Sequence, residues 1–304
     1  MTPTVRLFPL HQLPPDFGRG LDDPPDPPAT PRPAATLVLL RNGRGGMETL
    51  LLKRSKRLGF IPGAYVFPGG GVDREDGLPD LLPHLSGISP DAARTRLGME
   101  RGETGGGATS EPPPMAFFVA ALRETFEETG VLLGASPGDC RTFPAGGDSR
   151  EGELRARLLD GRRSFRQLLE ELAVELAAGS LRYIGHWVTP EAEPRRYDTR
   201  FFAVEVPRGC SVEPHPGEVA EALWMTPAEA LDRNRAGLLP LVYPTLRTLE
   251  ELEPFQDAKR ALEHFEGRCF PRLLPRLLRR PTGIEIVLDE PIGGPTGPEA
   301  SITG

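Results

Sequence analysis

The sequence predicts an α/β fold of the α+β kind, in which α-helices cover both faces of a mixed β-sheet. Three observations favour it. An apolar β-type run with turn residues opens the core at residues 35–52, a strongly helical stretch begins at Ala116, and strands and helices follow one another from residue 181 onward. That order of elements suits helices packed around one sheet. We also expect added helices near the C-terminal end.

The first core element is predicted to be a β-hairpin. The apolar run Ala35–Leu40 is followed by the turn-forming pairs Asn42-Gly43 and Gly45-Gly46, and then by Glu48–Leu52. Asn-Gly between apolar runs is a strong hairpin signal. A short strand at Tyr65–Phe67 should follow and end at Pro68-Gly69-Gly70-Gly71.

A long irregular stretch is predicted between residues 77 and 115. It contains Gly105-Gly106-Gly107 and Pro112-Pro113-Pro114, which are typical of loops, and one possible small helix capped by Ser89. From Ala116 the apolar residues recur at helical spacing, and Gly130 stands where a glycine often ends a helix.

The second half should alternate between helices and strands. Helices are expected within 151–178, from Pro227 after the capping residue Thr226, at Tyr243–Leu252 and at Phe255–Phe265. Strands are expected at Leu181–Val188, Arg200–Val206, Ala222–Met225 and Ile284–Leu288. We therefore divide the chain into a proline-rich, extended N-terminal arm (1–33), one domain (34–250, interrupted at 77–115), and a C-terminal helical extension and tail (251–304).

Charge and composition limit the class of partner. The formal net charge is -7 and the isoelectric point is about 5.4, whereas a nucleic-acid-binding domain is usually basic. We therefore expect no nucleic-acid partner. No apolar run reaches the roughly 18 residues of a transmembrane helix, so we expect no membrane partner either. An anionic small-molecule substrate stays compatible with this charge.

Cysteine usage suggests a compartment. Cys140, Cys210 and Cys269 are far apart and form no CxxC pair, so we expect reduced thiols and neither a disulfide framework nor a zinc site. The N-terminus lacks a basic segment followed by an apolar one, so we expect no secretory signal. Together these features favour a cytoplasmic protein.

The predicted helix from Ala116 carries a group of carboxylates. Glu124, Glu127 and Glu128 are spaced i, i+3 and i+4, which places them on one face. Taken alone, this pattern more often marks a solvated acidic face, with Arg123 paired to Glu127. A bound divalent cation would equally offset the like charges, because hard cations prefer carboxylate oxygens.

The surrounding residues favour the metal site, because they resemble the Nudix box G-x5-E-x7-R-E-U-x-E-E-x-G-U, where U is apolar. Residues 123–131 (RETFEETGV) match its second half, with Thr125 in the first U position. Counting from Gly70 places Asp76 where the box has Glu, and 115 − 76 = 39 residues are then inserted before the helix. The resemblance implies the Nudix fold and a Nudix hydrolase, a pyrophosphatase-type enzyme, and leaves the role of Asp76 open.

A second resemblance points to one branch of this superfamily, the coenzyme A diphosphatases. They carry an element similar to L-L-T-x-R-[S/A]-x3-R-x3-G-x3-F-P-G-G, which residues 50–70 follow, except that Leu52 stands for Thr and Gly59 for the second Arg. With the long insertion and residues 196–202 (RYDTRFF), the chain looks most like the acyl-coenzyme A diphosphatase, or nudix motif 19, branch.

The resemblance implies a role for each matching residue. Glu124, Glu127 and Glu128 would bind Mg2+ or Mn2+, and Arg123 would orient a carboxylate. A base or further ligand would be Glu218 or Glu221. Substrate binding would involve the residues of the glycine turn and of the basic run before it, namely Gly69, Gly70, Arg54, Lys56 and Arg57, with Lys53 in the same run and Arg195 and Arg196 as further cations.

The expected reaction is cleavage of the diphosphate of coenzyme A or acyl-coenzyme A into 3′,5′-ADP and (acyl-)4′-phosphopantetheine. Three alternatives stay open: a Nudix diphosphatase for NADH, ADP-ribose or another nucleoside diphosphate, a non-catalytic nucleotide-binding regulator, and an interaction protein built on the proline-rich arm. Acyl-chain preference, the base and the oligomeric state also stay open.

Overall fold

The main β-sheet is organised around the long strand β2 (Arg32–Asn42). In this computed structural model, all residues are described except 1–3, 15–16, 57–60, 100–110, 137 and 289–304. The strand order is β10-β3-β2-β9-β8-β11, with β4 beside β3 and β5 beside β2. The bounds are β3 Met47–Arg54, β4 Tyr65–Val66, β5 Gly69–Gly71, β8 Arg182–Val188, β9 Tyr197–Glu205, β10 Val219–Met225 and β11 Arg272–Leu273.

The sheet is mixed, as predicted. Strand β2 runs antiparallel to β3, which confirms the hairpin, and parallel to β9. Its side chains alternate between two cores: Leu37 and Leu39 belong to one, Val38 and Leu40 to the other. A strand buried on both faces needs a continuous apolar run, which is what the sequence provides there.

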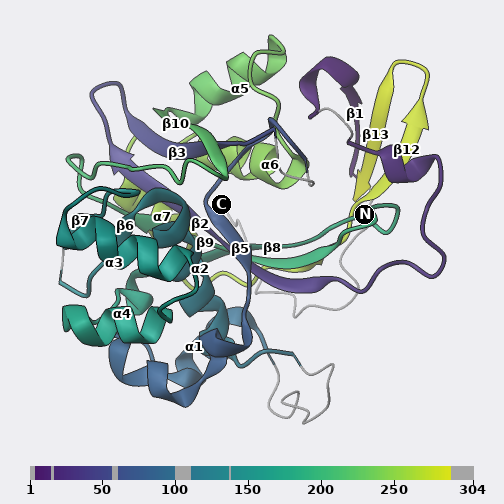
Figure 1. Cartoon of the computed structure of the whole chain (residues 1–304). Helices are drawn as coiled ribbons and strands as arrows, with labels where there is room; N and C mark the ends of the chain where they lie inside the picture. Colours follow the sequence, from purple (N-terminus) through teal and green to yellow (C-terminus); the bar gives the residue numbers. More distant parts are fainter. Residues whose placement is uncertain (1–3, 15–16, 57–60, 100–110, 137, 289–304) are drawn as a thin grey trace, which may run out of the picture.

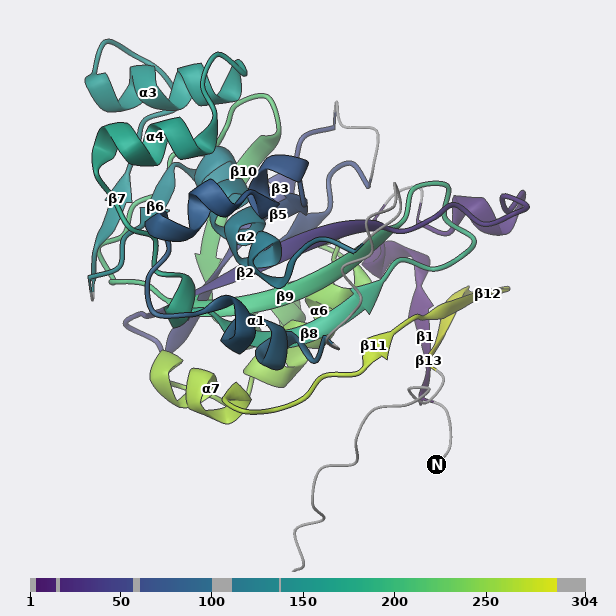
Figure 2. The same ribbon diagram turned by 90° about the horizontal axis from the view of Figure 1, so that it is seen from below.

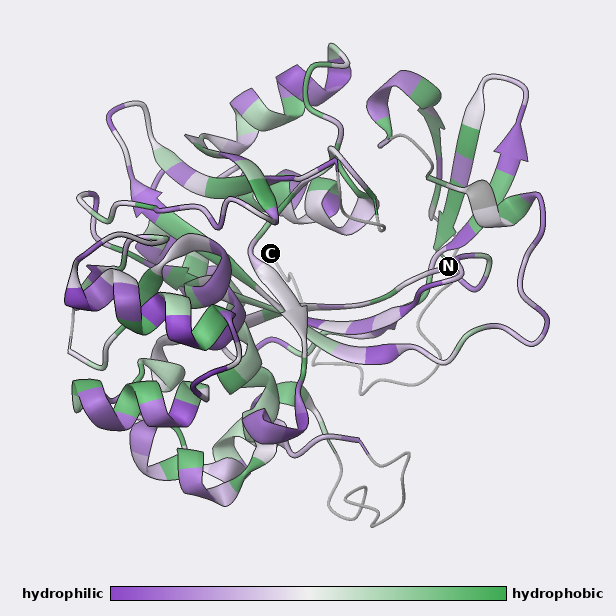
Figure 3. Ribbon diagram, in the orientation of Figure 1, coloured by the Kyte–Doolittle hydropathy of each residue, from purple (hydrophilic) through white to green (hydrophobic). Residues whose placement is uncertain are grey.

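Helices cover both faces (Figures 1 and 2). One face carries α2, which packs on β2, together with α1, α3 and α4, and the other carries α5, α6 and α7. Their bounds are α1 Pro90–Leu97, α2 Pro114–Thr129, α3 Arg150–Leu159, α4 Phe165–Leu172, α5 Pro227–Arg235, α6 Tyr243–Leu252 and α7 Ala258–Phe265. Figure 3 shows hydrophilic and hydrophobic stripes along the outer helices α3, α4 and α5. Within the described part of the chain, no helix combines the length and apolar composition needed to cross a membrane.

The insertion contains ordered structure that packs on α2. The Ser89 side chain accepts a hydrogen bond from the Ala92 amide at the start of α1, which confirms the predicted small helix. Leu81, Ala93 and Leu97 join the core beneath α2. Short 3-10 helices precede α1 at Arg74–Gly77 (η3) and Pro79–His84 (η4), and others lie at Leu10–Gln12 (η1), Arg19–Leu21 (η2) and Ala178–Ser180 (η5).

The two ends of the chain form a second, antiparallel sheet. Its order is β1-β13-β12, from Thr4–Pro9, Gly283–Leu288 and Arg276–Arg280. Residues 4–9 of the arm that the sequence predicted to be extended form the strand β1, and they lie ahead of most of its prolines. The C-terminal extension is only partly helical, since α7 is followed by β11, β12 and β13. Phe8 is buried and lies edge-on to Tyr243 of α6, which joins this sheet to the body.

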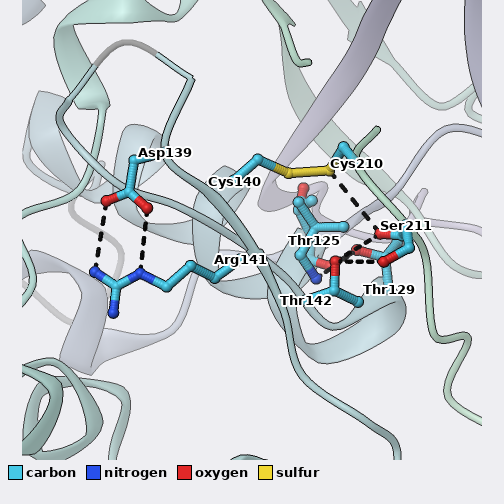
Figure 4. Close-up of a disulfide and its surroundings, with 9 residues drawn as sticks. Thr125, Thr129, Asp139, Cys140, Arg141, Thr142, Cys210 and Ser211 are labelled. Carbon is cyan, nitrogen blue, oxygen red and sulfur yellow. Dashed lines mark hydrogen bonds and ion pairs between the residues drawn. A yellow bond between two sulfur atoms is a disulfide. The ribbon is translucent and has the colours of Figure 1, made fainter. Parts of the chain in front are cut away.

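The prediction of reduced thiols is also wrong for two of the three cysteines. Cys140 is the first residue of β7 (Cys140–Thr142), which pairs with β6 (Val131–Leu133) in a small hairpin, and it forms a disulfide with Cys210 (Figure 4). Sequence spacing could not show this pair, because 70 residues separate them and the β6–β7 hairpin brings them together. Cys269 is free and exposed.

Candidate active site

The glycine strand β5 lies directly against the acidic end of α2. The Gly69 amide donates a hydrogen bond to Glu128 Oε2 at 3.0 Å. A Cβ on Gly70 would stand 2.5 Å from the carboxyl carbon of Glu124, so only glycine leaves that carboxylate in place. Gly69 has φ +156°, and a Cβ there would lie 2.4 Å from the carbonyl oxygen of Ala35. The glycine turn and the carboxylates, predicted as one site, are therefore in contact.

Arg123 connects the two halves of the Nudix box, which the insertion separates in sequence. Its Nε and NH2 donate to the two carboxylate oxygens of Asp76 at 2.9 Å each, and NH2 also donates to the Gly71 carbonyl at 2.9 Å. Both side chains are nearly excluded from solvent, at 8% and 2% exposure. A two-bonded arginine–carboxylate pair is strong and fixes geometry. Asp76 thus anchors Arg123, which answers the question that the sequence left open.

The same guanidinium holds two carboxylates of the helix. Arg123 NH1 donates to Glu124 Oε1 at 2.9 Å and to Glu127 Oε2 at 3.2 Å. The pair with Glu127 is the one that a plain acidic face would show. Glu124 is different, because it also lines the cavity beside the glycine strand, as Glu128 does. Arg123 therefore orients one carboxylate toward the cavity while it binds another.

The carboxylates at this end of α2 are crowded together and buried. Burial raises the pKa of Glu124 to about 7, although Arg123 opposes the shift. Burial, followed by the charge of Glu124, raises the pKa of Glu128 to about 8, and Glu218 adds to it. Burial also raises the pKa of Glu127. Closely spaced buried carboxylates favour either a proton or a cation between them.

The donor set fits a hard divalent cation, with one restriction. Glu124 and Glu128 offer carboxylate oxygens, the donors that Mg2+ prefers, beside a glycine strand without side chains. As they are placed, no three potential ligands among the described residues are close enough together to hold a metal. Glu127, engaged by Arg123, does not line the cavity.

The other predicted site residues separate into two groups. Arg54 and Glu218 line the same cavity as Glu124, Gly69 and Gly70. Glu221 lies outside it, where it accepts a hydrogen bond from the Tyr65 hydroxyl at 2.7 Å and lies 3.9 Å from Lys53. Lys56 is exposed and does not line the cavity. Arg57, like Gly59, falls outside the described residues.

The flanking arginines differ in role. Arg195 lines the cavity, whereas Arg196 donates to the carbonyls of Thr189 and Ala29 and so holds the N-terminal arm. Further along, Arg200 donates to Glu111 at 2.8 Å and to Asp198 at 2.9 Å, which fixes the end of the insertion to β9. Arg196 and Arg200 therefore support the fold around the site.

Arg155 is a supporting residue that the sequence did not reveal. It is fully buried, and its guanidinium donates to three backbone carbonyls: Glu127 at 2.8 Å, Phe143 at 2.9 Å and Glu213 at 2.7 Å. The first belongs to α2 and the last to the loop that leads to Glu218. An arginine next to Leu154, on the side of α3 that faces the core, was the available signal.

The loop before Glu218 is tied to α2 at further points. The Glu213 amide donates to the Thr129 carbonyl at 2.8 Å, and the His215 amide to the Glu128 carbonyl at 2.9 Å. Figure 4 shows the disulfide to Cys210 beside the contact between Thr142 and Ser211, a hydroxyl pair 3.0 Å apart. These contacts set where Glu218 stands relative to the helix carboxylates.

The cavity extends well beyond the carboxylates. Its volume is about 540 Å3, within the range of small-molecule sites. Away from the glycine strand it is lined mainly by apolar and aromatic side chains from the main sheet, the start of α6, the terminal sheet and the N-terminal arm. They include Phe17, Trp187, Val188, Tyr243, Leu277 and Ile286.

Comparison with known proteins agrees with this geometry. The family model described as NUDT19 Nudix domain matches residues 30–252. "Acyl-coenzyme A diphosphatase NUDT19" of Gallus gallus is 32% identical over 262 residues, which are 72% of this chain and 66% of that protein. The Homo sapiens protein of the same name is 30% identical over 274 residues, 83% of this chain and 69% of that protein. The chain thus spans only about two thirds of these relatives.

A solved structure shares the fold. The NUDIX hydrolase from Alicyclobacillus acidocaldarius is 30% identical, with a TM-score of 0.58, and the match covers 77% of this chain and 96% of that one. The predicted α+β arrangement, a mixed sheet between helices, is confirmed as a Nudix fold. The carboxylate helix, the glycine strand and these matches lead to one conclusion. The chain belongs to the Nudix hydrolases, in the family of the NUDT19 Nudix domain.

Proposed function

We propose that this protein is a Nudix diphosphatase that hydrolyses coenzyme A or acyl-coenzyme A to 3′,5′-ADP and (acyl-)4′-phosphopantetheine. The observation that carries the proposal is one cavity in which Glu124, Glu128, Glu218 and Arg54 meet beside the glycine strand. The names of the relatives, which are acyl-coenzyme A diphosphatases, support the substrate class.

The cofactor would be Mg2+ or Mn2+. Glu124 and Glu128 would hold it, and Glu127 directly precedes Glu128 in the same helix. When bound, such a cation polarises a phosphoryl oxygen and makes water more acidic. Arg123 keeps Glu124 directed toward the cavity, and the Gly69 amide keeps Glu128 in place.

Glu218 is the better candidate for the base. It lines the cavity, whereas Glu221 is engaged by the Tyr65 hydroxyl outside it. A base must reach the proton that it removes, so its place in the cavity supports Glu218 over Glu221. Arg54 would bind phosphate oxygens from the cavity wall, and the run with Lys53, Lys56 and Arg57 would attract the 3′-phosphate of the adenosine half.

The deciding experiment is a substrate panel with identified products. Purified protein, with Mg2+ or Mn2+, is given coenzyme A, an acyl-coenzyme A, NADH and ADP-ribose. We expect 3′,5′-ADP as the main product and the highest kcat/KM for the coenzyme A compounds. Faster cleavage of ADP-ribose or NADH would contradict the substrate class, and binding without turnover would indicate a non-catalytic regulator.

The division into domains and the cellular location of the protein are also proposals. We treat residues 34–250 as the catalytic domain, with the terminal segments packed on it through the β1-β13-β12 sheet. The cytoplasmic location expected from the sequence stays a prediction. Cell fractionation tests it. Gel filtration with light scattering tests the oligomeric state.

A further inference from the structure

We infer that the apolar half of the cavity is a binding site for the acyl-pantetheine arm of the substrate, so that the two chain termini help to select acylated coenzyme A. The inference rests on the proposed function for the orientation of the substrate. Its own evidence is the continuity of the cavity, the distribution of charge in it, and the segments that wall it.

The floor of the cavity crosses four strands without interruption. Gly71 of β5 is in register with Ala34 of β2, Ala34 with Thr199 of β9, and Thr199 with Trp187 of β8. Residues in register point to the same face of a sheet, and all four line the cavity. Three steps between strands span about 14 Å. The glycine strand next to the carboxylates is therefore connected to Trp187 along one face.

The small side chains on this floor leave room for a ligand. A Cβ on Gly71 would meet no atom within 4 Å, so this position opens into free space. Ala34 and Thr199 follow it, and the larger Trp187 closes the far side. An extended chain can lie across these residues with one end at the carboxylates.

The walls at the far end come from segments outside the core of the sheet. Leu277 and Ile286 belong to β12 and β13, Phe17 to the N-terminal arm, and Tyr243 to the start of α6. The rings of Tyr243 and Trp187 lie edge to face, with centroids 5.7 Å apart. The apolar end is thus built by residues that are distant from the Nudix box in sequence.

Charge decides which half of the substrate faces this end. Among the described residues lining the cavity, the charged side chains away from the glycine strand are Glu193 and Arg195, one of each sign. The adenosine half of coenzyme A carries a phosphate monoester and needs a cation, and Arg54 lines the opposite end of the cavity, beside the glycine strand. The uncharged pantetheine arm and its apolar acyl chain suit the end with Phe17, Leu277 and Ile286.

The first test measures substrate preference in a matched pair of variants. Leu277 faces the cavity and is 7% exposed, whereas its neighbour Leu278 is 36% exposed and does not line the cavity. In Leu277→Gln, the ratio of kcat/KM for octanoyl-coenzyme A to that for free coenzyme A should fall about tenfold, because one apolar contact typically changes selectivity by that order. Leu278→Gln should keep the wild-type ratio. A ratio that is the same in both variants overturns the inference.

The second test does not require catalysis. S-octanoyl-pantetheine, which has no diphosphate, is titrated while tryptophan fluorescence is followed. Trp187 lines the cavity, and Trp224 lies outside it under the Arg41 guanidinium at 4.0 Å. We expect a saturable change in the wild type that is lost in Trp187→Phe. No change in the wild type, or a change that persists in Trp187→Phe, overturns the inference.

The two tests separate this inference from the proposed function. If neither coenzyme A nor octanoyl-coenzyme A is cleaved but Trp187 responds, the proposed function fails and the acyl site stands. If both are cleaved with no response of Trp187 and no change of ratio in Leu277→Gln, the function stands and the acyl site fails. Phe17→Ala, from a different segment, should lower the ratio in the same direction as Leu277→Gln.

Discussion

Arg123 and Asp76 are joined by two hydrogen bonds of 2.9 Å, across an insertion of 39 residues. This pair reconnects the two halves of the Nudix box. It also explains why an aspartate suffices where the pattern has a glutamate, since Arg123 reaches Asp76 directly and uses NH1 for the helix carboxylates. The insertion therefore leaves the contacts of Arg123 with both halves of the box in place.

Loss of this pair should destabilise the fold. Asp76→Asn removes the charge opposite a buried guanidinium, and hydrogen bonds to charged groups contribute about 1.5–3 kcal/mol. We expect the free energy of unfolding to fall by about 2 kcal/mol in urea denaturation. Asp73 lies 3.5 Å from Arg123 but is 71% exposed. Asp73→Asn should therefore change stability by less than about 0.5 kcal/mol, and an equal effect of both variants would contradict the assignment.

Neutralising Glu128 should abolish activity without unfolding the protein. Glu128→Gln keeps an acceptor for the Gly69 amide and removes one of two neighbouring buried charges. We expect kcat/KM to fall by about 100-fold or more, because even residues that only support a metal ligand are often worth 10–100-fold. The Tm without metal should stay the same or rise. Glu127→Gln should also remove most turnover with the fold intact. Wild-type rates in Glu128→Gln would refute its assignment as a metal ligand, and wild-type rates in Glu127→Gln would show that Glu127, which does not line the cavity, is not a ligand.

The two candidate bases should differ sharply. Glu218→Gln is expected to lower kcat by about 100-fold, at the low end for loss of a general base. Glu221→Gln should lower it by less than about threefold, because that side chain binds Tyr65 outside the cavity. Rates are compared at saturating metal. If Glu221→Gln lowered kcat more than Glu218→Gln, the base would lie on β10 and Glu221 would have to leave Tyr65.

Arg155 should position the loop that carries Glu218. Arg155→Lys keeps the positive charge but cannot donate to the carbonyls of Glu127, Phe143 and Glu213 together. We expect a loss of about 2–3 kcal/mol in unfolding free energy, because unsatisfied buried carbonyls are costly. We also expect a lower kcat with KM little changed. A stable variant with normal kcat would show that the other contacts of the loop suffice.

The ion pairs of Asp198 should make stability depend on acid pH. Burial opposes ionisation, but His186, Arg200 and Arg272 outweigh it and hold the pKa of Asp198 below its ordinary value. A lowered pKa contributes stability above the pKa of the unfolded state, and that contribution is lost as pH falls below it. Asp198→Asn should therefore cost about 1.5–3 kcal/mol at pH 7, and the difference from wild type should narrow below about pH 4. A difference independent of pH would contradict the pairing.

Several elements were predictable because their signals are local. The hairpin of β2 and β3, the Ser89-capped helix and the end of α2 at Gly130 follow from turn residues, a cap and helical spacing. Gly130 has φ +73°, the left-handed conformation in which helices commonly end. The pairing of residues 4–9 was missed because their partner β13 lies near the other end of the chain, and the prolines that follow them suggested an extended arm without a partner strand.

By itself, the sequence determined which residues form the candidate metal site. Helical spacing places Glu124, Glu127 and Glu128 on one face, and the glycine turn precedes them, whatever the rest of the chain does. Only the tertiary structure decided which glutamates face the cavity. The Arg123–Asp76 pair, the position of Glu218 in the cavity, the contacts of Arg155 and the Cys140–Cys210 bond all depend on residues far apart in the chain. Such contacts depend on how the strands are ordered and on which charges are buried together, and no local pattern encodes either.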